Sequence, residues 1–182
     1  MLLSSQDWKS FVPSEVRSVF ENASLHSLEA GERAVLAKLR TMDEEAFEAL
    51  PYGSEGLWRK LMHASRSCAT LEQIIAATKS KRYTRTRIDR MIMCAFLGIS
   101  QEMLEADVPY TRVLAFNDRG RAILKDAKQK GIYLNAGENI DHPHWDLERR
   151  CGDLYGLFCT EGIDAPGCEE KRRIYYHTDS QE

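Results

Sequence analysis

The sequence predicts a mainly α fold, a multi-helix bundle with a small two-stranded parallel β-α-β unit near the carboxy terminus. Apolar residues recur at helical spacing through most of residues 1–107. After Pro109, two short runs rich in β-branched and aromatic residues flank a helical pattern, which is the order of strand, crossover helix and parallel strand. The chain has 182 residues, 43% of them apolar, so it can bury a core of ordinary size.

The helices of the first part are predicted from apolar spacing and from the residues at their ends. Thr70 and Gln73 have the spacing of a capping box, which starts a helix at Leu71. The helix over about residues 84–99 has the clearest apolar face, and its second half is apolar on the other side as well. We therefore expect its carboxy half to be buried and its amino half to reach solvent. The other expected helices cover about residues 13–23, 28–41, 43–49 and 54–65.

The carboxy-terminal part combines strands with helices. Residues 110–116 are expected to form a strand, and Asn117 and Asp118 to cap a helix that runs to about Lys130. A second strand over residues 132–135 would pair in parallel with the first, and a last helix would start near Pro143. The expected domains are a helical domain over 1–107, a strand-helix-strand unit with the final helix over 108–160, and a loosely ordered tail over 161–182.

Composition argues against several classes of protein. No apolar run approaches the length of about 18 residues that a membrane span needs, and no apolar secretion segment follows Met1. Five cysteines at unpatterned spacings favour reduced thiols, so the expected location is the cytoplasm. A zinc site is not expected, because its candidate ligands are too loosely spaced. Those candidates are His142, His144, Cys151, Cys159 and Cys168.

Basic residues concentrate in residues 79–90, which we call the basic segment. It contains six lysines and arginines against one acid, Asp89, for a local charge of +5. The rest of the chain carries 19 basic and 27 acidic residues, or −8, so the net charge of −3 hides this concentration. The candidate RNA-binding residues in the segment are Lys79, Lys81, Arg82, Tyr83, Arg85, Thr86, Arg87 and Arg90.

The order of residues in the basic segment lowers the stability of the folded chain. Six cations repel one another, and they lie at a helix amino terminus, where the helix dipole favours acidic residues. Arg87 occupies the position where a capping box begun by Thr84 would place Glu. An anion such as phosphate would relieve both conflicts, and Tyr83 is a candidate for stacking on an unpaired base. The alternative is a solvated helix face whose cations pair with acids elsewhere in the chain.

The basic segment, KSKRYTRTRIDR, resembles the strongest motif of the bacterial tRNA(Met) cytidine acetate ligase family. Other segments agree in order with that family, so the resemblance covers roughly residues 10–160. They are Glu55-Gly56-Leu57, residues 68–75, residues 110–116 with Asn117-Asp118-Arg119-Gly120-Arg121, and Asp153-Leu154-Tyr155.

The resemblance implies a role in acetylating the wobble cytidine of elongator tRNA(Met) from acetate and ATP through an acetyl-adenylate. It is taken to cover only the helical carboxy-terminal half of such an enzyme, since none of the five histidines begins the HxGH motif of the ATP-binding half. We therefore expect no catalytic residue, no metal and no cofactor in this chain, with ATP bound by an amino-terminal nucleotidyltransferase half. The expected partners are tRNA and that half. The alternative is a docking module whose basic segment completes the nucleotide site of the nucleotidyltransferase half.

Overall fold

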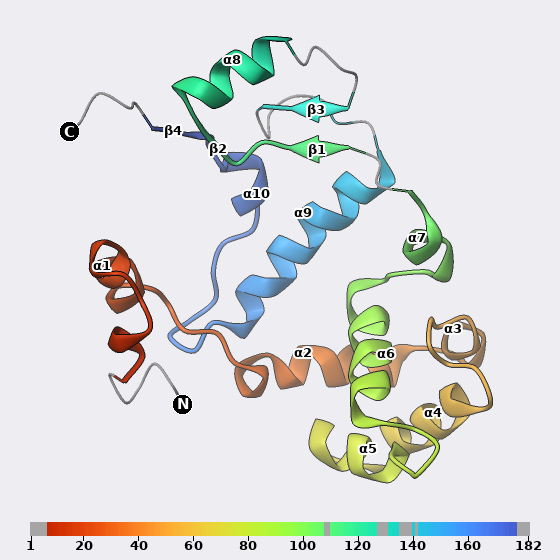
Figure 1. Ribbon diagram of the computed structural model, residues 1–182. Helices are drawn as coiled ribbons and strands as arrows, with labels where there is room; N and C mark the ends of the chain where they lie inside the picture. Colours follow the sequence, from red (N-terminus) through yellow and green to blue (C-terminus); the bar gives the residue numbers. More distant parts are fainter. Residues whose placement is uncertain (1–6, 108–109, 127–130, 135–139, 141, 178–182) are drawn as a thin grey trace.

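The fold is mainly helical with small parallel sheets, as predicted (Figure 1). The computed structural model describes residues 7–107, 110–126, 131–134, 140 and 142–177. The first part contains the short 3-10 helices η1 (Asp7–Ser10) and η2 (Ser14–Val16), and then α1 (Arg17–Glu21), α2 (Leu28–Thr41), α3 (Glu44–Glu48), α4 (Leu57–Ser67), α5 (Leu71–Thr78), α6 (Arg85–Leu97) and α7 (Gln101–Glu105). The second part contains β1 (Thr111–Arg112), β2 (Ala115–Asn117), α8 (Asp118–Asp126), β3 (Ile132–Tyr133), α9 (Pro143–Tyr155), the 3-10 helix η3 (Gly156–Phe158), α10 (Cys168–Lys171) and β4 (Tyr175–His177).

Short polar side chains define where several helices begin. The predicted capping box is present: the backbone N–H of Gln73 donates to the Thr70 hydroxyl, and the Gln73 side chain accepts from the Thr70 N–H. Asp43 caps α3 through a 2.8 Å hydrogen bond from the Ala46 N–H. At the carboxy end of α6, Gly98 has a φ of +71°. Glycine adopts this left-handed conformation without steric cost, and it ends the helix.

The core lies where α6 crosses α2, with α5 packed against both helices and α4 packed against α2 and α5 (Figure 1). The predicted apolar face of α6 is buried, including Ile88 and Met91, which are fully enclosed. The aromatic ring of Phe158, from the turn after α9, meets Phe96 edge to face at 5.6 Å and joins this core. The tryptophans Trp8, Trp58 and Trp145 are all buried.

The expected parallel β-α-β unit is present, with one correction. Strand β1 pairs in parallel with β3, and α8 lies between them in sequence. The single strand expected over residues 110–116 is wrong, because the chain here forms two short strands in two sheets. Its first part, β1, pairs with β3, whereas its second part, β2, pairs with β4 from the far end of the chain. A segment with one continuous strand pattern in its sequence therefore forms two strands, because its two parts pair with different strands.

Part of the segment expected to be a loosely ordered tail forms regular structure. Within residues 161–182, α10 packs against α9 and β4 pairs with β2. The sequence pattern did not indicate β4, because its partner is distant in sequence and a three-residue strand has too few positions to show alternation. The expected domain boundary near residue 108 and the end of the α8 prediction at Lys130 fall outside the described residues.

None of the helices in the described residues is both long enough and apolar enough to cross a membrane.

Gly31 provides a test of how tightly α2 packs on the segment after α9. A Cβ atom at Gly31 would lie 2.3 Å from the Phe158 ring, closer than any van der Waals contact allows. Alanine favours helix by about 1 kcal/mol over glycine. Overpacking a core costs about 1–3 kcal/mol, and an approach this close to an aromatic ring should cost about 2–3 kcal/mol. We therefore expect Gly31→Ala to lower the free energy of unfolding by about 1–2 kcal/mol, measured by urea denaturation.

The matched control is Lys38→Ala, on an exposed position of the same helix. It should change the free energy of unfolding by less than about 0.5 kcal/mol. A Gly31→Ala protein as stable as the parent would contradict the packing of Phe158 against α2.

Candidate functional site

The basic segment joins α5 to α6 and includes the first turn of α6. Lys79 follows the last residue of α5, and Thr84 caps α6, its hydroxyl accepting a 3.4 Å hydrogen bond from the Arg87 N–H. Between them, the backbone groups of Ser80 and Tyr83 donate to each other at 3.2 Å in both directions, which closes a tight turn. The segment is therefore held at both ends by helices that are themselves anchored in the core.

Tyr83 is the buried anchor of the basic segment. Only 9% of its surface is exposed, and its hydroxyl donates a 2.6 Å hydrogen bond to the Glu55 carbonyl oxygen. Cationic groups of Lys60, Arg82 and Arg87 lie 5.8–6.0 Å from the ring centroid. In this structure the ring packs in the core rather than standing free, which differs from the exposed base-stacking platform considered from the sequence.

The turn at residues 52–56 receives hydrogen bonds from the basic segment. Arg87 donates to the Tyr52 carbonyl oxygen at 2.9 Å and to the carbonyl and hydroxyl oxygens of Ser54 at 3.2 and 2.7 Å. Tyr52 and Glu55 have φ angles of +65° and +63°, which non-glycine residues seldom adopt. Backbone in such a conformation persists where its surroundings hold it, and here Arg87 and the Tyr83 hydroxyl supply the contacts.

Two carboxylates outside the segment pair with its arginines. Arg82 and Glu55 form a pair with N–O distances of 3.0 and 3.1 Å, and Arg87 lies 3.7 Å from the same carboxylate. Arg85 donates hydrogen bonds to both carboxylate oxygens of Glu72 at 2.7 and 2.6 Å, the bidentate geometry that guanidinium favours. Hydrogen bonds from Arg82 hold the pKa of Glu55 below its usual range, and those from Arg85 do the same for Glu72.

The other cations of the segment remain directed to solvent. Within the described part of the chain, the side chains of Lys79, Lys81 and Arg90 form no hydrogen bond or ion pair, although Arg90 lies 6.0 Å from the centre of the Tyr52 ring. Thr86 is exposed beside them. Six cations set against Asp89, Glu55 and Glu72 leave a local excess of three positive charges. The segment therefore keeps an excess positive charge after its internal pairs are formed.

The sequence indicates the cations of the basic segment but not the acids that pair with them. Glu55 and Glu72 lie 27 and 13 residues from the arginines they bind, on different elements. Glu55 belongs to one of the segments that carried the family resemblance, which was the only sequence signal for it. The pairing with acids, considered as the alternative, is present for Arg82, Arg85 and Arg87, and is not seen for the other three basic residues in the described part of the chain.

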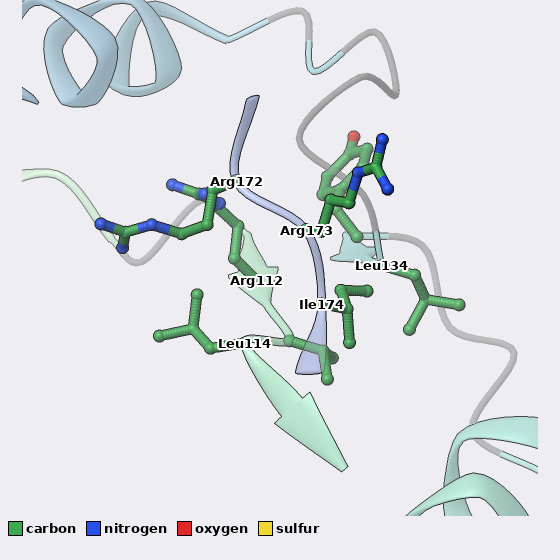
Figure 2. A pocket seen from close by; sticks show the side chains of 8 residues that line it. Arg112, Leu114, Leu134, Arg172, Arg173 and Ile174 are labelled. Carbon is green, nitrogen blue, oxygen red and sulfur yellow. The ribbon is translucent and has the colours of Figure 1, made fainter. Parts of the chain in front are cut away.

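A second ionic cluster lies at the sheet end of the molecule. Arg112 of β1 binds Glu148 of α9 at 2.6 Å and Glu169 of α10 at 3.1 Å, and Arg172 also pairs with Glu169. Burial and a hydrogen bond to Glu148 raise the pKa of Tyr110. Figure 2 shows the shallow hollow beside this cluster, between β1 and the segment that leads into β4. These contacts fasten α9 and α10 to the sheet, so we read the cluster as structural.

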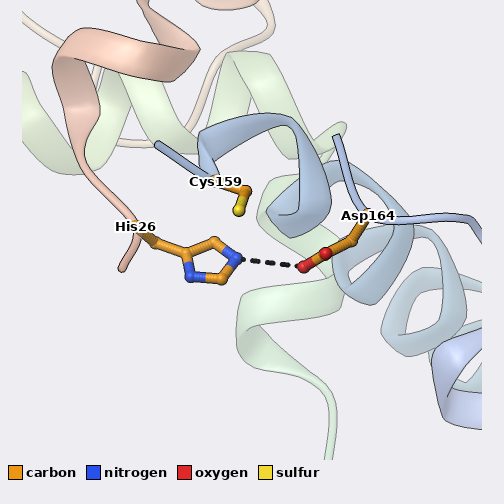
Figure 3. Close-up of side chains that lie close together, drawn as sticks. All are labelled: His26, Cys159 and Asp164. Atoms are coloured by element: carbon orange, nitrogen blue, oxygen red, sulfur yellow. Dashed lines mark ion pairs between the residues drawn. The ribbon is translucent and has the colours of Figure 1, made fainter. Parts of the chain in front are cut away.

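The histidines and cysteines considered as zinc ligands do not gather at one place. His142 caps α9, its Nδ1 accepting a hydrogen bond from the His144 N–H at 3.1 Å. Cys151 lies in the middle of α9, and Cys159 follows its far end. Cys159 lies instead beside His26 and Asp164, neither of which is among the zinc-ligand candidates named from the sequence (Figure 3).

Comparison with known proteins gives a family and a shared fold. The HIGH Nucleotidyl Transferase family profile matches residues 2–165. The tRNA(Met) cytidine acetate ligase of Kosmotoga olearia is 35% identical over 174 residues, which is 82% of this chain and 41% of that protein. The protein of the same name from Bacillus mycoides is 27% identical over 164 residues, 84% of this chain and 42% of that one. This chain therefore spans less than half the length of these relatives.

Solved structures agree on the fold. A crystal structure of Thermotoga maritima TmcAL bound with alpha-thio ATP superimposes with a TM-score of 0.79 at 21% identity, over 97% of this chain and 50% of that one. An apo structure of the same protein gives a TM-score of 0.79 at 20% identity, over 97% and 49%.

The family match corrects one expectation. The expectation that the chain covers only a helical carboxy-terminal half, outside the nucleotidyltransferase, is wrong. The HIGH Nucleotidyl Transferase profile itself extends over residues 2–165. The HxGH motif does not mark the whole nucleotidyltransferase, because the profile matches this chain without that motif.

The two carboxylates of the site should titrate below the usual value of about 4.3 for glutamate, because arginine hydrogen bonds favour their charged forms. Arg85→Ala should raise the titration midpoint of Glu72 towards that value and leave the midpoint of Glu55 unchanged. Arg82→Ala should raise the midpoint of Glu55 and leave that of Glu72 unchanged. Carboxyl NMR titration measures both midpoints in one sample. An unchanged Glu72 midpoint in Arg85→Ala would contradict the pairing.

The same shifts give the sign of a pH effect. A carboxylate whose pKa is lowered by folding stabilises the protein above the unfolded-state pKa, and that stabilisation is lost as the pH falls through the folded-state value. Both pairs are solvent-exposed, so the effect on the free energy of unfolding should be small.

Proposed function

Since this chain belongs to the HIGH Nucleotidyl Transferase family, we propose that it takes part in making N4-acetylcytidine at the wobble position of elongator tRNA(Met). In this proposal acetate and ATP supply the acetyl group through an acetyl-adenylate. The similarity to tRNA(Met) cytidine acetate ligases supports the choice of reaction and of tRNA. We assign this chain the task of binding tRNA through the basic segment, in the cytoplasm.

The observation that carries the proposal is the set of unpaired cations on a fixed loop and on the start of α6 that follows it. Lys79, Lys81 and Arg90 keep their charges available while Tyr83 and its hydrogen bond hold the loop in place. A loop that is ordered before binding loses less conformational entropy when a ligand arrives. Phosphate groups of RNA are the ligands that such exposed cations favour.

The internally paired residues have a positioning role in this proposal. Arg82 and Arg87 tie the segment to the 52–56 turn, and Arg85 ties it to α5 through Glu72. A guanidinium has five N–H donors, so each of these arginines retains donors that could reach a phosphate. Thr86 adds an exposed hydroxyl at the same helix end. Tyr83 acts through the loop that it anchors.

We propose no catalytic residue, catalytic metal or resident organic cofactor in this chain. The HxGH motif does not occur in these 182 residues, and the basic segment provides cations rather than an acid–base pair. ATP enters the proposal through the family and through the solved TmcAL structure with alpha-thio ATP. The second candidate function is that the segment contacts the phosphates of a bound nucleotide, since the same cations suit both ligands.

The test is tRNA binding measured against salt concentration. If the segment makes four to six phosphate contacts, log K should fall with log salt at a slope of about −3.5 to −5.5. Replacing Lys79, Lys81 and Arg90 with Ala should flatten that slope by about 2 to 3, since each lost contact removes about 0.7–0.9. Fluorescence anisotropy with labelled tRNA(Met) measures the slope, and an unchanged value would exclude the segment as the RNA-binding surface.

A charge-matched control separates contact from general attraction. Arg33, Lys38 and Lys125 are exposed on α2 and α8, so changing all three to Ala removes the same charge elsewhere. This control should leave the slope nearly unchanged. Titration of both variants with ATP tests the second candidate: weakened ATP binding with unchanged tRNA binding would favour the nucleotide role.

A further inference from the structure

We propose that His26, Cys159 and Asp164 form a zinc-binding site that clips the start of α2 to the segment after η3 (Figure 3). One nitrogen, one sulfur and one carboxylate oxygen from these residues lie within 4.8 Å of one another. Imidazole nitrogen, thiolate and carboxylate are the three protein ligands of zinc. The site is separate from the basic segment and does not depend on the proposed function.

The separation of the His26 nitrogen and the Asp164 oxygen fits a tetrahedral ion. Bonds of about 2.0–2.1 Å from zinc to nitrogen and to oxygen place those two atoms about 3.3 Å apart across a tetrahedral angle. His26 Nε2 lies 3.4 Å from Asp164 Oδ2. That is longer than the 2.7–2.9 Å or so of a charged hydrogen bond, and it nearly equals the separation that a shared zinc would impose.

In its neutral form, with Nδ1 as the donor, His26 turns a nitrogen without a proton towards this cluster. Its Nδ1 is 3.2 Å from the Ser24 carbonyl oxygen, which can only accept, so Nδ1 carries the proton in the neutral ring. Nε2 then presents a lone pair, and it is buried without a hydrogen-bond partner among the described residues. A lone pair that faces a carboxylate oxygen is repelled by it. A cation between the two removes that repulsion.

The surrounding structure holds the ligands in place. His26 and Cys159 form an antiparallel bridge, with the Ser27 N–H donating to the Phe158 carbonyl at 2.9 Å and the Thr160 N–H to the Leu25 carbonyl at 2.8 Å. Tyr155 stacks on the imidazole with ring centroids 4.1 Å apart and planes within 8°. An oriented imidazole whose second nitrogen bonds a carbonyl oxygen is the usual arrangement around a metal-bound histidine.

The charges of the site suit a divalent ion. Cys159 is buried, and binding would release its thiol proton, so the thiolate and the Asp164 carboxylate together balance the two charges of zinc. Asp164 is exposed on its outer side, which leaves the fourth position to solvent. The site joins residues that are 133 positions apart in sequence, from His26 to Cys159, so zinc would fasten the two ends of the helical core together.

The test is zinc binding to the full chain, measured by competition with a chromophoric chelator and by elemental analysis after dialysis. We expect one zinc per chain, with affinity reduced at least 10-fold in Cys159→Ser and in Asp164→Asn. Cys168→Ser is the matched control, since Cys168 is an exposed cysteine outside the cluster. Cobalt in place of zinc should give a thiolate charge-transfer band that Cys159→Ser alone loses.

A second measurement needs no variant. Zinc should protect Cys159 from alkylation in the unchanged protein, read by peptide mass spectrometry, while Cys168 continues to react. Three outcomes would overturn the proposal and leave the cluster as an ordinary His26–Asp164 ion pair. They are less than one zinc per chain, equal zinc affinity in Cys159→Ser and Cys168→Ser, and equal labelling of Cys159 with and without zinc.

Discussion

The burial of α6 is the constraint on which the rest of the structure depends. This helix packs against α2, α5 and α9, and most of its length is enclosed. Its carboxy half has no polar face to offer water, so it must lie in the core, and its amino end consequently reaches the surface. That end carries the basic segment. The location of the candidate site is thus a consequence of hydrophobic packing, and the loop between α5 and α6 has little freedom to lie elsewhere.

The basic segment combines two kinds of cation. Arg82, Arg85 and Arg87 bind acids or backbone oxygens and give the loop its shape, whereas Lys79, Lys81 and Arg90 keep their charge for a partner. The conflict between clustered cations and a helix amino terminus is therefore only partly relieved within the chain. Glu55 and Glu72 supply the relief, and the two left-handed non-glycine residues of the 52–56 turn are held by the same arginine and tyrosine contacts.

The basic segment and the cluster of His26, Cys159 and Asp164 have different relations to the core. The basic segment projects from the amino end of α6, where an incoming polyanion can reach it. The cluster of His26, Cys159 and Asp164 lies at the start of α2, beside the Phe158 side chain that closes the core. The exposed cations of the basic segment make few contacts within the chain, which suits a ligand that binds and leaves. The second has a buried nitrogen and sulfur held by backbone pairing, which suits a structural ion.

The sequence by itself determined the features that arise from neighbouring residues. The capping box at Thr70, the extent of α6 and the parallel pairing across α8 follow from local hydrogen bonding and from the period of apolar residues, and the structure confirms them. Only the tertiary structure decided that Tyr83 is buried, that Glu55 and Glu72 neutralise part of the segment, and that His26 meets Cys159. Those contacts join residues 13 to 133 positions apart, and periodicity has no information on which distant segments pack together.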